Sequence, residues 1–172
     1  MPVIKFTESR NLDLPPGFRQ IRRDDINKPF SSHDVKMRGY NLGYFYQWSQ
    51  EPDTLVLVKD GSHGYLDGII LLRFVPGKSQ PEKMMIEMLS RNFQSGSSSS
   101  GIGTDLLKMA EKHVAGPLGV NEIVIDAVSG LEDYYNNMGF VKTGKEEYDQ
   151  YWGKIVYMHK ILNNDRNNLH IL

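Results

Sequence analysis

The segment SSSSGIGTDLL, residues 97–107, joins a run of small residues to the start of a helical pattern. The first amides of a helix have no partner within it and carry partial positive charge, and glycines there let the backbone approach a phosphate closely. Gly101, Gly103 and the hydroxyl of Thr104 are placed for such a role. The segment therefore predicts an anion-binding loop, although a surface linker before an unrelated helix explains the same residues.

Two familiar nucleotide-binding loops do not fit this segment. Thr104-Asp105 stands where a Walker A loop has lysine followed by serine or threonine, and Leu106 takes the place of the third glycine in a dinucleotide-binding GxGxxG. Strong secondary-structure patterns lie on both sides of the segment. This favours a functional loop inside one domain over a joint between two.

The elements around the loop are those of an α/β chain with a mixed sheet. The expected strands are Phe18–Ile26, Thr54–Lys59, Tyr65–Val75, Lys83–Asn92, Asn121–Val128 and Tyr151–Leu162. Short helices are expected between residues 27 and 50. A longer helix should bury Ile102, Leu106, Met109, Ala110 and Val114 on one face and end at Gly116-Pro117. Residues 130–138 should form a short helix that ends at Gly139.

Only one connection between these strands has the length of a parallel crossover. It joins the strand at residues 83–92 to the strand at residues 121–128, so this pair should be parallel and the others antiparallel. The fold expected is α/β or α+β, with a largely antiparallel central sheet of about six to seven strands and helices on both faces. The first dozen residues are expected to be loose. Residues 1–165 should form one domain and residues 166–172 a mobile tail.

Composition excludes several classes of protein. The 172 residues have a net charge of −1 and no cysteine, which argues against a broad nucleic-acid surface, a disulfide framework and a cysteine nucleophile. The five histidines show no ligand spacing, so no metal site is expected. The N-terminal residues lack the apolar core of a secretory signal, and no apolar run approaches the roughly 20 residues of a membrane span. A cytoplasmic protein is expected, with no nucleic-acid or membrane partner.

The order of these motifs resembles the GNAT superfamily of N-acetyltransferases. The matching pieces are MMIEMLSRN, SSSSGIGTDLLKMAEKH, VNEIVIDAV and YYNNMGF, which lie between residues 84 and 144. The family pattern is a strand, an Arg/Gln-x-x-Gly-x-Gly/Ala loop, a helix, a strand and a short helix that ends in Tyr-x-x-x-Gly-Phe. Residues 128–140 also resemble a segment in the acetyltransferase half of the Elongator catalytic subunit.

The resemblance implies acetyl-coenzyme A as the acetyl donor and an amine as the acceptor. It places the pyrophosphate on the loop-to-helix amides and the pantetheine arm beside the end of the preceding strand. Ser98 takes the position of the family's arginine or glutamine, which removes one strong phosphate contact. The implied coenzyme A contacts are Leu89, Ser90, Arg91, Ser98, Ser99, Ser100, Gly101, Ile102, Gly103 and Thr104.

The resemblance also implies the residues that handle protons. Tyr135 matches the tyrosine of Tyr-x-x-x-Gly-Phe and would protonate the departing thiolate, while Tyr134 would pack or line the acetyl pocket. Glu87 is the expected base, because relatives carry a carboxylate on this strand and apolar neighbours raise a carboxyl pKa. By alternation Glu87 should share a face with Met85 and Leu89. A solvated carboxylate explains Glu87 equally well, and Asp126 on the next strand competes with it.

The sequence thus predicts an N-acetyltransferase that acts by direct attack of an amine in a ternary complex. The acceptor is a small-molecule or peptide amine, and a homodimer is possible. The aromatic cluster from Tyr40 to Trp48 lines the acceptor cleft or forms plain core. The alternative is a non-catalytic protein of the same fold that binds or senses acyl-coenzyme A.

Overall fold

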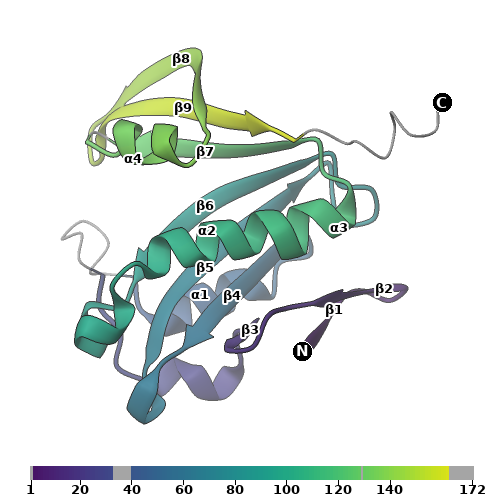
Figure 1. Cartoon of the computed structure of the whole chain (residues 1–172), viewed down its shortest axis with the longest axis vertical. Coiled ribbons are helices and arrows are strands. Elements are labelled where there is room, and N and C mark those ends of the chain that lie inside the picture. Colours follow the sequence, from purple (N-terminus) through teal and green to yellow (C-terminus); the bar gives the residue numbers. More distant parts are fainter. Residues whose placement is uncertain (1, 33–39, 129, 163–172) are drawn as a thin grey trace.

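One seven-stranded sheet organises the chain. A computed structural model describes residues 2–32, 40–128 and 130–162. The sheet has the order β3-β4-β5-β6-β7-β9-β8, and every neighbouring pair is antiparallel except β6 and β7, which are parallel. Helices lie on both faces, with α2 in front of β5 and β6 and α1 behind the sheet (Figure 1). The expected mixed sheet is confirmed.

The element boundaries are as follows. The strands are β1 (Val3–Thr7), β2 (Arg10–Asp13), β3 (Phe18–Gln20), β4 (Thr54–Asp60), β5 (Leu66–Val75), β6 (Lys83–Arg91), β7 (Glu122–Val128), β8 (Val141–Asp149) and β9 (Gly153–Ile161). The helices are α1 (Leu42–Ser49), α2 (Ile102–Ala110), α3 (Gly116–Leu118) and α4 (Glu132–Asn137). Shorter turns are η1 (Arg23–Asn27), η3 (Ser62–Gly64), η4 (Phe93–Ser99) and the π-helical η5 (Glu111–Ala115).

The central strands are buried on both faces because helices cover both. Residues of β4 alternate between two cores: Leu55 and Leu57 face α2, whereas Val56 and Val58 face α1. Near-continuous apolar sequence is typical of strands covered on both sides. On the α2 side the five residues expected on one helical face are all buried, namely Ile102, Leu106, Met109, Ala110 and Val114.

The long helix continues beyond its predicted end. A π-helical turn, η5, follows α2 directly, and α3 then runs to Leu118 and ends at Gly119, whose φ is +71°. Pro117 did not stop the helix, because it lies in the first turn of α3, where a missing N–H costs no hydrogen bond. The positive φ of Gly119 ends the helix instead.

Three expectations for the rest of the chain need correction. The first dozen residues are not loose, because β1 and β2 form a hairpin that buries Ile4, Phe6 and Leu12 in the α2-side core. The strand expected at Phe18–Ile26 ends at Gln20, where η1 follows. The sheet also contains β8, which the sequence did not reveal. The predicted C-terminal tail, residues 166–172, lies outside the described residues.

Candidate active site

The parallel strands β6 and β7 separate partway along their length. They pair from Lys83 with Glu122 to Ile86 with Ile125, and no pair follows between the described residues, although β6 continues to Arg91. A cavity of about 540 Å³ occupies this region. Its lining includes Glu87, Leu89, Ser90, Arg91, Asp126, Val128, Leu131, Tyr135, Tyr40, Ser32 and Trp152. The three backbone positions expected beside a pantetheine arm, Leu89 to Arg91, therefore line a cavity.

A β-bulge at Glu87 sets the directions of the side chains here. Leu71 of β5 pairs with Met88 and Leu72 pairs with Ile86, so Glu87 has no partner on β5. The extra residue shifts the alternation by one position. As a result Leu89 packs with the α2-side core, while Met88 packs with the α1-side core. The expectation that Glu87, Met85 and Leu89 share one face is therefore wrong.

The two candidate bases follow the last parallel pair, one on each strand. Glu87 accepts a hydrogen bond from Nε of Arg73 at 2.8 Å, which also makes an ion pair. The carboxylate of Asp126 makes no hydrogen bond or ion pair with any residue that the structure describes. Asp126 is an exposed residue of β7, but partial desolvation raises its pKa, the nearby carboxylates of Glu87 and Glu147 raise it further, and Lys145 and Arg73 lower it by less. The competitor Asp126 is thus the carboxylate with a free oxygen and a raised pKa.

The two tyrosines of α4 have different surroundings. Tyr135 is buried and lines the cavity, and burial raises its pKa to about 12, with a smaller contribution from Tyr134. Its phenol therefore keeps its proton at neutral pH. The Tyr134 hydroxyl instead lies 2.9 Å from Oγ1 of Thr104 at the start of α2. The two rings lie edge to face at 5.2 Å between centroids, so the start of α2 and the cavity are neighbours.

The serine-glycine segment ends in an uncapped helix start. Gly101, the residue before α2, has a left-handed φ of +76°, and no side chain caps the helix there. The first bond inside α2 is donated by Asp105 to the carbonyl of Gly101, so the N–H groups of Ile102, Gly103 and Thr104 precede it. The Ile102 side chain is buried in the core, and Ser100 is exposed. The side chains of Ser98 and Ser99 lie outside what the structure describes.

The aromatic cluster divides between the two predicted roles. Tyr40 lines the cavity, whereas Phe45 is fully buried in the α1-side core and Trp48 is partly exposed. Trp152, in the turn before β9, also lines the cavity. Sequence reasoning missed Trp152, because Tyr151 and Trp152 were expected to begin the last strand, which starts at Gly153 instead.

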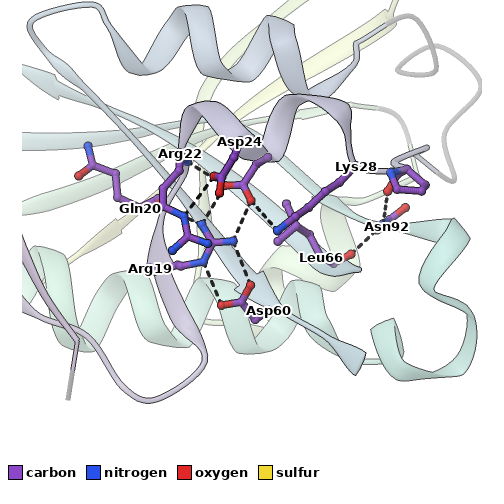
Figure 2. Close-up of polar contacts among 10 residues, drawn as sticks. Arg19, Gln20, Arg22, Asp24, Lys28, Asp60, Leu66 and Asn92 are labelled. Atoms are coloured by element: carbon purple, nitrogen blue, oxygen red, sulfur yellow. Dashed lines mark hydrogen bonds and ion pairs between the residues drawn. The ribbon is translucent and has the colours of Figure 1, made fainter. Parts of the chain in front are cut away.

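Buried polar residues fix the chain next to the cavity, and sequence reasoning missed these too. Asn92 follows β6 and is fully buried. Its side-chain amide donates to the carbonyl of Leu66 (Figure 2) and to that of Pro29. Its oxygen accepts from the N–H groups of Ser31 and Gln94. All four bonding positions of this side chain are used. Asn92 therefore joins the end of β6 to the segment that leads to Ser32 in the cavity wall.

A second polar cluster holds η1 against the sheet. Arg19 of β3 donates two hydrogen bonds to the buried carboxylate of Asp25, each of 2.8 Å, and two more to Asp60 of β4 (Figure 2). Lys28 also donates to Asp25. Burial alone would raise the pKa of Asp25, but the bonds from Arg19, Lys28 and the Arg22 backbone hold it well below its ordinary value.

The described residues contain neither a candidate metal site nor a candidate membrane span. No group of three or more histidine, aspartate or glutamate side chains lies close enough together to hold a metal ion within residues 2–32, 40–128 and 130–162. None of the helices described is both long enough and apolar enough to cross a membrane.

This chain is similar to known acetyltransferases in part of its sequence and in its fold. Residues 89–162 match the family model described as acetyltransferase (GNAT) domain. No curated protein matches the sequence significantly. Among solved structures, PaiA N-acetyltransferase from Thermoplasma acidophilum in complex with coenzyme A has a TM-score of 0.58 and 20% identity, over 84% of this chain and 98% of that one.

Two further solved structures have the same fold. A GNAT-family acetyltransferase from Streptococcus pneumoniae gives a TM-score of 0.57 at 16% identity, over 85% of this chain and 98% of that chain. A chimera of the Vibrio cholerae spermidine N-acetyltransferase SpeG and hSSAT gives a TM-score of 0.62 at 14% identity, over 84% of this chain and 93% of that chain. At these identities the similarity establishes the fold alone.

Proposed function

We propose that this chain, in which residues 89–162 form an acetyltransferase domain of the GNAT type, transfers the acetyl group of acetyl-coenzyme A to a primary amine. The amine attacks directly in a ternary complex. The observation that carries the proposal is the separation of β6 from β7 after Ile86 and Ile125, beside the uncapped start of α2. Among the described residues nothing pairs with this strand edge or with these helix amides, so both suit one extended ligand.

The start of α2 fits a pyrophosphate. The N–H groups of Ile102, Gly103 and Thr104 come before the first bond inside the helix, and the dipole of α2 favours an anion there. No heavy atom of the described residues lies within 4 Å of the position that a Cβ on Gly101 would occupy. A phosphate can therefore approach this backbone closely. Ser98, Ser99 and Ser100 would supply further amides or hydroxyls as the loop closes around it.

The free edge of β6 fits the pantetheine arm. Beyond Ile86 its residues pair with β5 on one side and with no described strand on the other. Buried or half-buried backbone polar groups need partners, and the amide groups of an extended pantetheine provide them. Leu89, Ser90 and Arg91 would hold the arm in this way. When bound, acetyl-coenzyme A supplies the acetyl group as an activated thioester.

The proton transfers are assigned to Asp126 and Tyr135. An amine attacks only after losing its proton, and Asp126 is a better acceptor than Glu87, since Glu87 is bonded to Arg73 and Asp126 has no such partner. Glu87 then acts mainly through its charge, which raises the pKa of Asp126. Tyr135 lines the same cavity with its phenol protonated, as donation to a departing thiolate requires.

Several features of the sequence hypothesis stay predictions. They are the cytoplasmic location, the homodimer and the single domain over residues 1–165. The resemblance of residues 128–140 to the Elongator acetyltransferase segment transfers no acceptor to this chain. Spermidine belongs to the name of one structural neighbour and, at 14% identity, is one amine to be tested among others.

The alternative function is that of a non-catalytic acyl-coenzyme A binder, favoured by the serine at position 98. Calorimetry with coenzyme A and a thiol-release assay with acetyl-coenzyme A and mixed amines separate the two. We expect micromolar binding and amine-dependent thiol release, with the acetylated amine detected by mass spectrometry. Binding without release would support the binder, and absence of binding would contradict both functions.

A further inference from the structure

The charge at the amine end of the cavity matches one ammonium group. Three carboxylates interact here, those of Glu87, Asp126 and Glu147. Two cations lie near them among the described residues: Arg73, which pairs with Glu87 at 2.8 Å, and Lys145. Glu147 lies on the same face, because Asp126 pairs with Tyr157 and the Tyr157 hydroxyl donates to Glu147. Lys145 stands over the Tyr157 ring, 4.4 Å from its centroid. A second ammonium group near Glu147 would therefore find this carboxylate already bonded to the Tyr157 phenol. The cation of Lys145 close by would also repel it.

In the part of the chain that the structure describes, the cations near Asp126 are Arg73 and Lys145, and each already has a partner, Glu87 or the Tyr157 ring. Arg91 is the cation of the cavity lining, and it lies four residues beyond Glu87 on β6. At about 3.3 Å per residue this is roughly 13 Å along the strand. The carboxylate of an α-amino acid lies on the carbon that bears the amine, so it cannot reach Arg91 while its amine is near Asp126. Repulsion from Asp126 would disfavour such a ligand.

Aromatic and apolar side chains form the walls beyond the carboxylates. Tyr40, which precedes α1, stacks on Tyr44 with 4.6 Å between ring centroids. Trp152, in the turn between β8 and β9, lies edge to face with Tyr151 at 5.0 Å. Both Tyr40 and Trp152 line the cavity although they come from distant parts of the chain. Met88 and Ile155 add apolar surface on the α1 side of the sheet.

From this combination, and resting on the proposed function, we infer that the acceptor is a primary amine with a single positive charge, an aromatic or alkyl body and no acidic group. The ammonium binds Asp126, and the body packs between the rings of Tyr40 and Trp152. Aromatic walls contribute both apolar contact area and ring stacking, which favour a flat or aliphatic body over a second charged group.

The test is a comparison of matched amines in the thiol-release assay with acetyl-coenzyme A. Phenethylamine and phenylalanine share a body and differ by one carboxylate, while butylamine and 1,4-diaminobutane share a length and differ by one ammonium. We expect kcat/KM to be at least 10-fold higher for phenethylamine than for phenylalanine, and higher for butylamine than for 1,4-diaminobutane. Equal or reversed preferences would overturn the inference and leave the proposed acetyl transfer intact. Failure of all four amines, with thiol release from the mixed amines, would overturn the inference alone, and absence of release with every amine would overturn the proposed function as well.

A pair of variants tests the aromatic wall. Trp152→Ala should raise KM for phenethylamine about 10-fold and leave KM for acetyl-coenzyme A nearly unchanged. Tyr148→Ala is the matched control, because Tyr148 lies in the same hairpin, is 80% exposed and does not line the cavity. The Tyr148→Ala variant should leave KM unchanged for both phenethylamine and acetyl-coenzyme A. An unchanged KM for phenethylamine in a folded Trp152→Ala variant would contradict the placement of the amine body.

Discussion

Ile86 of β6 and Ile125 of β7 form the last parallel pair before the two strands separate. The next residue on each strand is a carboxylate, Glu87 and Asp126, and both line the cavity that follows. Glu87 keeps the face of Met85, which pairs with Arg73, and the bulge shifts the alternation from Met88 onward. One backbone irregularity thus coincides with the opening of the sheet and with two neighbouring carboxylates, where we propose that the amine loses its proton.

Gly103→Glu should weaken coenzyme A binding, because it places a carboxylate at the start of α2, where the phosphates are proposed to lie. Gly103→Gln is the control, since it adds a side chain of the same length without charge. We expect the dissociation constant for coenzyme A, measured by calorimetry, to rise at least about 10-fold more for glutamate than for glutamine, and the difference to shrink with added salt. An equal rise of the dissociation constant in the two variants would mean that no phosphate lies at the start of α2. Gly101 is less suitable for this test, because its φ of +76° would strain any side chain.

Asp25→Asn should destabilise the protein by about 2–4 kcal/mol, because it removes a buried charge that faces Arg19 and Lys28. Asp24→Asn is the control. Asp24 is 74% exposed, so its loss should change the free energy of unfolding by less than about 0.5 kcal/mol. Urea unfolding at pH 7 measures both values, and equal effects would show that the buried cluster contributes little.

The same variant tests the pH dependence of the cluster. The folded protein holds the pKa of Asp25 below its ordinary value, so the stability it contributes is complete above about pH 4 and declines as the pH falls further. The difference in stability between wild type and Asp25→Asn should therefore become smaller below pH 4. A difference that stays constant with pH would contradict the lowered pKa.

The sequence predicted those parts of the fold in which burial leaves a periodic pattern. The strand at residues 83–92, the glycine loop, the helix and the next strand all formed where expected. β8 was missed because all but the last of its nine residues are exposed, so it shows no alternation of apolar and polar side chains. The N-terminal hairpin was missed because its strands have only five and four residues.

The candidate site was predictable in its backbone and less so in its side chains. Glycine spacing revealed the start of α2, and Tyr-x-x-x-Gly-Phe pointed to Tyr135 at the cavity. The bulge at Glu87 was invisible, since no residue of MMIEM marks an extra position and a bulge depends on the pairing partner as well as on local residues. Asn92 looked like an ordinary loop residue because its four partners lie in three different segments of the chain.

Tyr135→Phe should slow the chemical step, because it removes the proposed proton donor while keeping the buried ring. We expect kcat to fall by roughly 10²–10⁴-fold with little change in KM for acetyl-coenzyme A. Tyr134→Phe should instead raise that KM several-fold, since it breaks the contact with Thr104 at the start of α2. An exchange of the two effects would show that the roles of the tyrosines are reversed. Near wild-type kcat in both variants would show that neither is the acid.

The pH profile of kcat should separate the two candidate bases. If Asp126 accepts the proton, kcat rises as Asp126 becomes ionised, and Asp126→Asn should lower kcat by roughly 10²–10⁴-fold and remove this rise. Glu87→Gln should keep most of the activity and move the rise to lower pH, because losing a nearby negative charge lowers the pKa of Asp126. Glu146→Gln is the control. Glu146 forms an ion pair with Lys154 and lies opposite the buried Val156 in the β8–β9 ladder, on the other face of the sheet from Asp126, so this variant should not shift the pH profile of kcat. Loss of activity in Glu87→Gln, with activity retained in Asp126→Asn, would assign the base to Glu87 instead.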